Sequence, residues 1–205
     1  MTDHIAVTGI VLAGGRSSRF GSDKLVARVD GERLVDRAVA ALGALRGIIT
    51  EVVIVSEPGA KRARAVFPAV TIRFVEDPES FGGPLVGLLA GLEAASEPLA
   101  LVVGGDMPSM RPEVLGLLVT RLVHAADASV VTLAALGRIV ALPMAIRTGA
   151  ATDVARRLLG DEERRLRSLA ERLPAIVVDE AEWRPLDPDG ATLRDVDRPE
   201  DLPAP

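Results

Sequence analysis

The hydrophobic positions of the chain form short continuous runs that alternate with segments of helical periodicity. The runs are rich in valine, isoleucine and leucine, which favour strands, and polar or glycine-containing turns bound them. We expect strands at residues 10–12, 52–55, 71–75, 99–103, 130–133, 139–146 and 176–178. The run 99–103 is apolar throughout, which is typical of a strand covered on both faces, so we place it near the centre of a sheet.

Helices are expected between these runs, where apolar residues recur at spacings of three and four. They cover residues 33–45, 61–66, 85–95, 112–126 and 154–173, the last in two pieces about Gly160. Pro84 and Pro112 each stand at the expected start of a helix, a position that tolerates proline. Strand, helix and strand in succession predict an α/β fold, a three-layer sandwich with a doubly wound, mostly parallel sheet.

Composition narrows the class of protein. The 205 residues carry 48% hydrophobic side chains and show no internal repeat or linker, so we expect one domain over residues 1–205. A net charge of −5 argues against binding to nucleic acid or to a membrane surface, and no run reaches the ~18 apolar residues of a membrane span. With no cysteine, disulfides, thiolate metal sites and cysteine nucleophiles are excluded, and a cytoplasmic location is expected.

The first expected strand ends in a glycine-rich loop with several cations. Gly14 and Gly15 allow the backbone to approach a ligand closely, because they lack Cβ atoms. The positive charges that follow are Arg16, Arg19 and Lys24. Cations around exposed N–H groups hold the oxygens of a polyphosphate, so we interpret this loop as a nucleoside triphosphate site rather than an ordinary turn.

Two common phosphate-binding loops do not fit this segment. The dinucleotide pattern G-x-G-x-x-G is absent, and a Walker loop requires Gly-Lys followed by serine or threonine. Here Gly21 is followed by Ser22, Asp23 and Lys24. The loop therefore belongs to a different class of nucleotide site.

Asp77 follows the expected strand 71–75 and precedes a glycine-rich turn that ends at Gly83. Ligands of open α/β sheets bind at the carboxyl ends of the strands. We therefore expect Asp77 to accept hydrogen bonds from a nucleotide sugar or base while the glycines let the backbone pass beside it. The alternative is a polar strand terminus followed by a helix cap.

Asp106 follows the apolar strand 99–103 and the pair Gly104-Gly105. Mg²⁺ prefers oxygen ligands and binds beside substrate phosphates, so Asp106 is a candidate magnesium ligand. The glycine pair indicates that something fits closely beside it. The alternative is a turn aspartate bonded to its own backbone.

At this point the motifs resemble a family, the molybdenum cofactor guanylyltransferases, within the wider group of nucleotidyltransferases. Leu12-Ala13-Gly14-Gly15, followed by the segment from Arg19 to Asp23-Lys24, is similar to the family's opening pattern. The resemblance implies that GMP passes from GTP to the phosphate of molybdopterin, with release of pyrophosphate and with Mg²⁺ as cofactor. Nucleotide-binding positions carried over in this way are Leu12, Ala13, Gly14, Gly15, Lys24, Asp77, Gly83 and Asp106.

The implied catalysis consists of positioning and charge neutralisation by Lys24, Arg19 and Arg16, with Asp106 as the metal ligand. A phosphate acceptor is already an oxyanion, so no protein nucleophile is required. His4 and His124, the only histidines, are expected at the terminus and on a helix surface, away from catalysis. The resemblance also implies transient contacts with other cofactor-biosynthesis proteins or apo-molybdoenzymes.

The chain departs from the family pattern at two places. Asp195 and Asp197 stand where the family commonly has asparagines, and they either join the metal site or cap the next turn. Residues 141–145 lack the histidine or polar residue that the family often has ahead of its proline, so the pterin side of the site is expected to differ.

Gly14 bears on the choice of nucleotide, because the cytidine-using relatives resemble Leu-Ala-Ala-Gly at this point. We expect GTP to be preferred over CTP, since the missing Cβ leaves room for a purine. Three alternatives stay open: a transferase that uses CTP, one that acts on phospholactate or a sugar phosphate, and a nucleotide-binding module without turnover.

Overall fold

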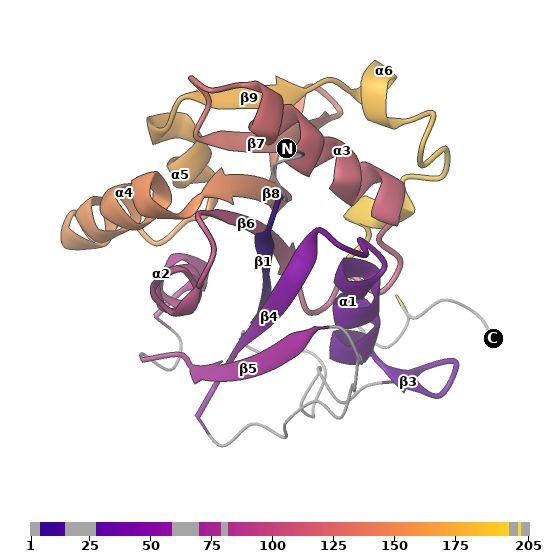
Figure 1. Ribbon diagram of the computed structural model, residues 1–205, viewed down its shortest axis with the longest axis horizontal. Helices are drawn as coiled ribbons and strands as arrows, with labels where there is room; N and C mark the ends of the chain where they lie inside the picture. Colours follow the sequence, from indigo (N-terminus) through magenta and orange to yellow (C-terminus); the bar gives the residue numbers. More distant parts are fainter. Residues whose placement is uncertain (1–4, 15–27, 59–69, 79–81, 197–200, 202–205) are drawn as a thin grey trace.

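One seven-stranded sheet forms the middle layer of the fold (Figure 1). The structure, a computed structural model, describes residues 5–14, 28–58, 70–78, 82–196 and 201. The strands are β1 (Val7–Ala13), β4 (Ile49–Ser56), β5 (Thr71–Glu76), β6 (Leu99–Gly104), β7 (Val130–Ala135), β8 (Arg138–Arg147) and β9 (Ala175–Val178). Their order is β5-β4-β1-β6-β8-β7-β9, and β8 alone runs antiparallel to its neighbours.

Helices cover both faces of this sheet. On one face α1 (Leu34–Gly43) and α3 (Pro112–His124) share a hydrophobic cluster with the sheet. On the other face α2 (Pro84–Ala94), α4 (Thr148–Gly160) and α5 (Arg167–Arg172) share a second cluster. The expected three-layer α/β fold with a mostly parallel sheet is thus confirmed.

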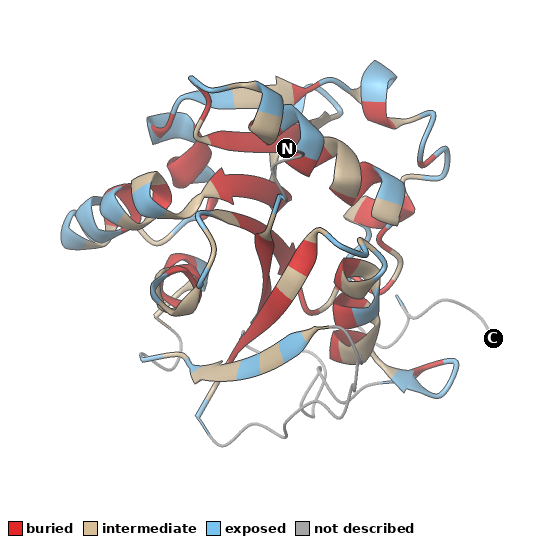
Figure 2. Cartoon of the chain, viewed as in Figure 1, coloured by how far each residue is buried: buried red, intermediate tan, exposed pale blue. Residues whose placement is uncertain are grey.

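The central strands supply both clusters, because successive side chains of a strand point to opposite faces. In β1, Val11 belongs to the cluster of α1 and α3, and Ile10 to the cluster of α2. In β6, Val103 and Val102 divide in the same way. Figure 2 shows these strands buried, whereas β5 at the edge of the sheet is only partly covered. The apolar strand expected at the centre is β6, fourth of the seven.

The structure adds elements that the hydrophobic pattern did not predict. A two-stranded hairpin, β2 (Arg28–Val29) and β3 (Glu32–Arg33), precedes α1. Helix α4 begins at Thr148, six residues before its expected start, and α6 (Glu180–Trp183) and a 3₁₀ turn, η3 (Ala191–Leu193), lie near the end of the chain. The helix expected at 61–66 lies outside the described residues.

In the described part of the chain, no helix combines the length and the apolar character needed to cross a bilayer.

Candidate functional site

The carboxyl ends of four neighbouring strands lie side by side along one border of the sheet, which we call its carboxyl edge. Register pairs Ala13 of β1 with Ser56 of β4, and Ser56 with Glu76 of β5. On the other side, Leu12 of β1 pairs with Gly104 of β6. The residues that follow these strands therefore share this edge, as expected for ligand-binding residues of an open α/β sheet.

Asp77 lies between the end of β1 and helix α2. Its backbone N–H donates to the carbonyl oxygen of Ser56 at 2.8 Å, which fixes the residue at the end of the sheet. Its Oδ2 lies 3.7 Å from the position that a Cβ on Gly14 would take, and 3.3 Å from the corresponding position on Gly87. Gly14 is exposed and lacks a Cβ, so the backbone at the end of β1 lies close beside the Asp77 carboxylate.

Helix α2 approaches the sheet closely through glycines spaced by four residues, the spacing that places them on one helix face. A Cβ on Gly91 would lie 2.8 Å from Cγ2 of Ile10, and one on Gly87 would lie 3.6 Å from Cγ1 of Val55. Gly87 therefore sets how near α2 lies to Asp77. The sequence analysis assigned no role to Gly87, although its spacing of four residues from both Gly83 and Gly91 is a signal that could have identified it.

Gly83 comes directly before α2, with a φ of 97° that favours glycine over other residues. A Cβ here would lie 3.0 Å from the Cβ of Arg164, and the N–H of Leu85 donates to the carbonyl oxygen of Arg164 at 3.3 Å. The connection between α4 and α5 thus lies against the start of α2. The sequence analysis missed Arg164, because only the folded structure brings it to this edge.

Glu163 shapes that connection. Its carboxylate accepts hydrogen bonds from the backbone N–H groups of Arg164 and Arg165 at 2.8 and 2.9 Å, and from the Arg165 guanidinium at 2.6 Å. The Arg165 guanidinium and these N–H groups hold the pKa of Glu163 far below its ordinary value. The carboxylate is therefore ionised at neutral pH and keeps Arg164 against α2.

Asp106 is partly buried at the end of β6, and protein atoms surround the two glycines before it. A Cβ on Gly104 would lie 2.6 Å from Oδ1 of Asp106, and one on Gly105 would lie 3.3 Å from the carbonyl oxygen of Leu12. That oxygen accepts the N–H of Gly105 at 2.9 Å. The close neighbours expected from the glycine pair include the Asp106 carboxylate itself and the backbone of β1.

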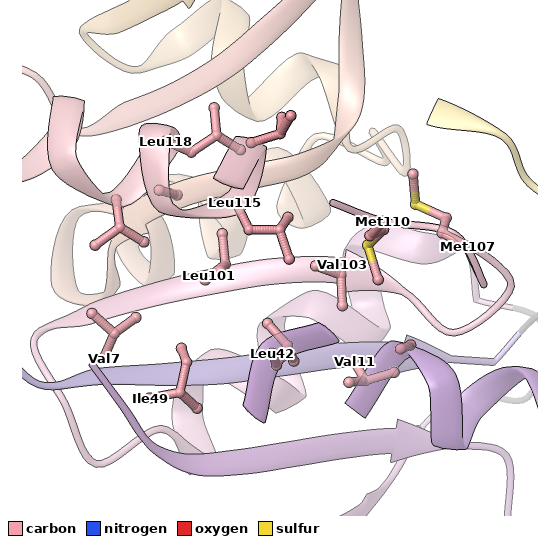
Figure 3. Close-up of a cluster of buried hydrophobic side chains, with 14 of the residues drawn as sticks. Val7, Val11, Leu42, Ile49, Leu101, Val103, Met107, Met110, Leu115 and Leu118 are labelled. Carbon is pink, nitrogen blue, oxygen red and sulfur yellow. The ribbon is translucent and has the colours of Figure 1, made fainter. Parts of the chain in front are cut away.

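The connection after Asp106 is fixed in the core. Met107 and Met110 are each 6% exposed and belong to the cluster of α1 and α3. Figure 3 shows both methionines beside Val103, the residue before the end of β6. Asp106 is therefore held between a central strand and two buried side chains.

The segment 187–196 returns to the same strand end. The N–H of Val196 donates to the carbonyl oxygen of Asp106 at 3.0 Å. Asp195, the residue before Val196, is exposed and therefore lies next to this hydrogen bond. Asp197 lies outside the described residues.

Asp187 anchors this returning segment. Its buried carboxylate accepts the N–H groups of Ala191 and Thr192 at 3.0 and 2.7 Å, while the Thr192 hydroxyl accepts the N–H of Arg111 at 3.0 Å. Burial alone would raise the pKa of Asp187, but the bonds from Thr192 and Ala191 and the charge of Arg111 lower it overall.

A Mg²⁺ ion at this edge would need few protein ligands. The described residues contain no group of three or more His, Cys, Asp or Glu side chains that could hold a metal ion. Mg²⁺ is commonly bound through one or two carboxylates together with substrate phosphates and waters. The partly exposed Asp106 fits that mode, and a cage made only of protein ligands is not required.

Some expected site residues lie outside the described part of the chain. These are Gly15, Arg16, Arg19 and Lys24. The residues that the structure does place, Leu12, Ala13, Gly14, Asp77 and Asp106, come together at one edge of the sheet, with Gly83 at the start of α2. His124 is exposed in the last turn of α3, as expected.

A family profile described as a MobA-like NTP transferase domain matches residues 9–177. The chain belongs to this family. It is therefore an enzyme of the nucleotidyltransferase class, and the resemblance seen in its motifs is confirmed.

Relatives agree with membership of the MobA-like family. The chain is 32% identical over 206 aligned residues to a protein of Chloroflexus aggregans named probable molybdenum cofactor guanylyltransferase, covering 98% of this chain and 94% of that protein.

Solved structures share the fold at lower identity. Molybdopterin-guanine dinucleotide biosynthesis protein A of Archaeoglobus fulgidus superposes with a TM-score of 0.77 at 21% identity, over 96% of this chain and 95% of that one. The 2-C-methyl-D-erythritol 4-phosphate cytidylyltransferase of Thermus thermophilus superposes with a TM-score of 0.69 at 20% identity, over 97% and 96%. The fold is thus common to transferases with different substrates.

Proposed function

We propose that this MobA-like enzyme transfers GMP from GTP to the phosphate of molybdenum-bound molybdopterin and releases pyrophosphate. The observation that carries the proposal is the match over 98% of the chain to a relative named as a probable molybdenum cofactor guanylyltransferase. The geometry supports it, because the strand ends place Gly14, Asp77 and Asp106 around one edge of the sheet.

In the proposed reaction an oxygen of the acceptor phosphate forms a bond to the α-phosphorus of GTP. The bond between that phosphorus and the oxygen leading to the β-phosphorus breaks, and pyrophosphate leaves with the electron pair. The acceptor oxygen is already anionic, so no histidine or other general base is needed, in keeping with the exposed His124.

Each site residue has a proposed role. Lys24, Arg19 and Arg16 neutralise charge on the triphosphate, and the backbone of Leu12, Ala13, Gly14 and Gly15 lies along the nucleotide. Asp77 accepts hydrogen bonds from the sugar or base, and Gly83 allows the start of α2 to lie close to Arg164. Asp106 is the proposed Mg²⁺ ligand, and bound Mg²⁺ would stabilise negative charge on the phosphates.

The nearest alternative is a transferase that uses CTP. The structural similarity to a cytidylyltransferase means that the fold by itself does not select the base. Gly14 favours GTP in this proposal, because the missing Cβ leaves more room for a purine beside the backbone next to Asp77. The proposal also places the enzyme in the cytoplasm and includes its expected transient contacts with partner proteins.

The deciding experiment measures pyrophosphate release from GTP, CTP, ATP and UTP with molybdenum-bound molybdopterin, at matched Mg²⁺ and acceptor concentrations. Acceptor-dependent release that is fastest with GTP is the expected result. Faster release with CTP would reassign the donor, and release only with a sugar phosphate or phospholactate would reassign the acceptor. Binding of GTP without release in any combination would identify a nucleotide-binding module.

A further inference from the structure

We propose that Val196 is a positioning residue for the transfer reaction. The inference rests on the proposed function, since it concerns the placement of the proposed metal ligand Asp106. The backbone of Val196 contacts Asp106, and its side chain contacts Val29 and Leu34. These two contacts join parts of the protein that are distant in sequence.

The backbone attachment fixes the end of β6. The N–H of Val196 donates to the carbonyl oxygen of Asp106 at 3.0 Å. Four residues earlier in the chain, Thr192 accepts the N–H of Arg111 through its hydroxyl at 3.0 Å. The returning segment is therefore bonded to both ends of the connection from Asp106 to α3.

The side-chain attachment reaches the β2–β3 hairpin. Val196 is 2% exposed and forms a small hydrophobic cluster with Val29 of β2 and Leu34 at the start of α1. This cluster is separate from the two main cores. Among the described residues, a change at Val196 therefore acts on this cluster and not on the main cores.

The hairpin is itself tied to helix α1. The Arg37 guanidinium donates to the carbonyl oxygen of Val29 at 3.3 Å and to the Asp30 carboxylate at 2.9 Å. In the sequence, the hairpin directly follows the segment that carries Arg16, Arg19 and Lys24. Val196 thus links Asp106 to the element at which the cationic segment ends.

Removing the two γ-methyl groups of Val196 should loosen this link without disturbing the main cores. Outer groups that hydrogen-bond metal ligands typically change metal affinity or activity by about 10- to 100-fold when they are mutated. Val196→Ala keeps its N–H and only loosens its position, so we expect kcat to fall by about tenfold, at the lower end of that range, and the Mg²⁺ concentration for half-maximal rate to rise severalfold. Val196→Ile keeps a branched apolar side chain and should stay within about threefold of the wild type.

The matched control is Val178→Ala. Val178 is 3% exposed and lies in β9, at the sheet edge farthest from β5 and outside the cluster of Val196. It should show a similar loss of thermal stability with unchanged kcat and Mg²⁺ dependence. If Val196→Ala changes these two parameters no more than Val178→Ala does, Val196 has a structural role only and the inference is overturned.

A double-mutant cycle tests the contact that the inference needs. Val29→Ala and Val196→Ala should each lower kcat, and the double variant should lose much less than the product of the two effects, because both break the same link. Fully multiplicative effects would contradict the coupling.

A readout without turnover separates this inference from the proposed function. Hydrogen exchange of the amides at residues 28–33 and 106–111 should be faster in Val196→Ala than in Val178→Ala. If the wild type releases no pyrophosphate with any donor and acceptor, the proposed function fails, and exchange then decides whether the link exists. Equal exchange in the two variants overturns the positioning inference even when the wild type is active.

Discussion

A substitution of Asp106 tests the proposed chemistry most directly. The backbone of Asp106 is fixed by the hydrogen bond from Val196 and by the end of β6. Replacing one carboxylate oxygen with an NH2 group should therefore leave the fold intact. Asp106→Asn should lower pyrophosphate release by more than about a hundredfold, because loss of metal binding removes several kcal/mol of transition-state stabilisation. Assays across a range of Mg²⁺ concentrations would check this. Normal turnover at ordinary Mg²⁺ concentrations would mean that Asp106 is not the metal ligand, and Asp195 or Asp197 would become the next candidate.

Lys24 offers a prediction with a control inside the same chain. It is one of two lysines in a protein that otherwise uses arginine, and a compact ammonium suits a phosphate. Lys24→Ala should abolish most GTP turnover with little change in melting temperature, whereas Lys61→Ala should leave both nearly unchanged. Both lysines lie outside the described residues. Near-normal turnover of Lys24→Ala would remove this lysine from the site.

Gly14 is the residue on which the donor preference depends. A methyl group here would lie 3.7 Å from Oδ2 of Asp77, an ordinary contact, so Gly14→Ala should fold normally. The same methyl group would occupy space that we assign to the purine. A buried hydrogen-bond partner contributes about 1–3 kcal/mol, so kcat/KM for GTP should fall by roughly 5- to 150-fold, and the value for CTP should fall less. An equal fall for both donors would show that Gly14 does not select the base.

At the scale of elements, the hydrophobic pattern predicted most strands and helices because each contributes a continuous buried face. The β2–β3 hairpin was missed because each strand has only two residues, too few for an alternating pattern. Its signal is the pair Asp30-Gly31, whose positive φ values of 51° and 81° fit a two-residue hairpin turn. The antiparallel direction of β8 has a similar local cause, since the two residues between β7 and β8 leave no room for a crossover.

At the opposite end of the sheet, where β1 and β4 begin, a polar network joins these two strands to the connection between α2 and β6. Glu51 accepts from the Thr8 hydroxyl at 2.9 Å, and from the N–H and hydroxyl of Ser96 at 2.8 and 3.0 Å. Glu51→Ala would leave the buried Thr8 hydroxyl without its acceptor and should destabilise the protein by about 1–3 kcal/mol. Because the network lies at the amino ends of β1 and β4, kcat of the folded variant should be unchanged.

Chemical denaturation with parallel turnover assays would check the role of Glu51. The control is Glu93→Ala, which removes an exposed ion pair with Arg156 and should cost less than about 1 kcal/mol. A large fall in kcat for Glu51→Ala at temperatures where it is folded would mean that the two edges of the sheet are coupled.

At the scale of the whole molecule, the sequence predicted the sheet and the strand-end residues but not the packing of the chain's final segment. Arg111 and Thr192 are 81 residues apart, and no local pattern indicates that their hydrogen bond forms. The approach of Arg164 to Gly83 is equally long-range. Hydrophobic patterns with a period of two or 3.6 residues indicate which face of a strand or helix is buried. The two long-range contacts depend instead on how the folded elements pack against one another. The single domain over residues 1–205 stays a prediction.

Acid sensitivity is the last property of the whole molecule that the structure predicts, and the buried carboxylates Glu51 and Asp187 are its expected main source. Burial alone would raise the pKa of Glu51, but hydrogen bonds from Ser96, Thr8 and Arg73 lower it overall. The pKa of Asp187 is lowered for the same kind of reason. A carboxyl group whose pKa is lower in the folded than in the unfolded protein stabilises the fold above its unfolded pKa, and that contribution is lost as the pH falls towards its folded pKa.

The unfolded values lie at about 3.9 for aspartate and about 4.3 for glutamate, so stability should be held down to about pH 5 and then decline. Melting temperatures between pH 7 and pH 3 would measure this decline. Asp187→Asn and Glu51→Gln should each be less stable than the wild type at pH 7 but lose less on acidification, because the group that must take up a proton is gone. The exposed Asp127→Asn should reproduce the wild-type curve. If both buried variants lose stability as steeply as the wild type, other carboxylates govern the acid limit.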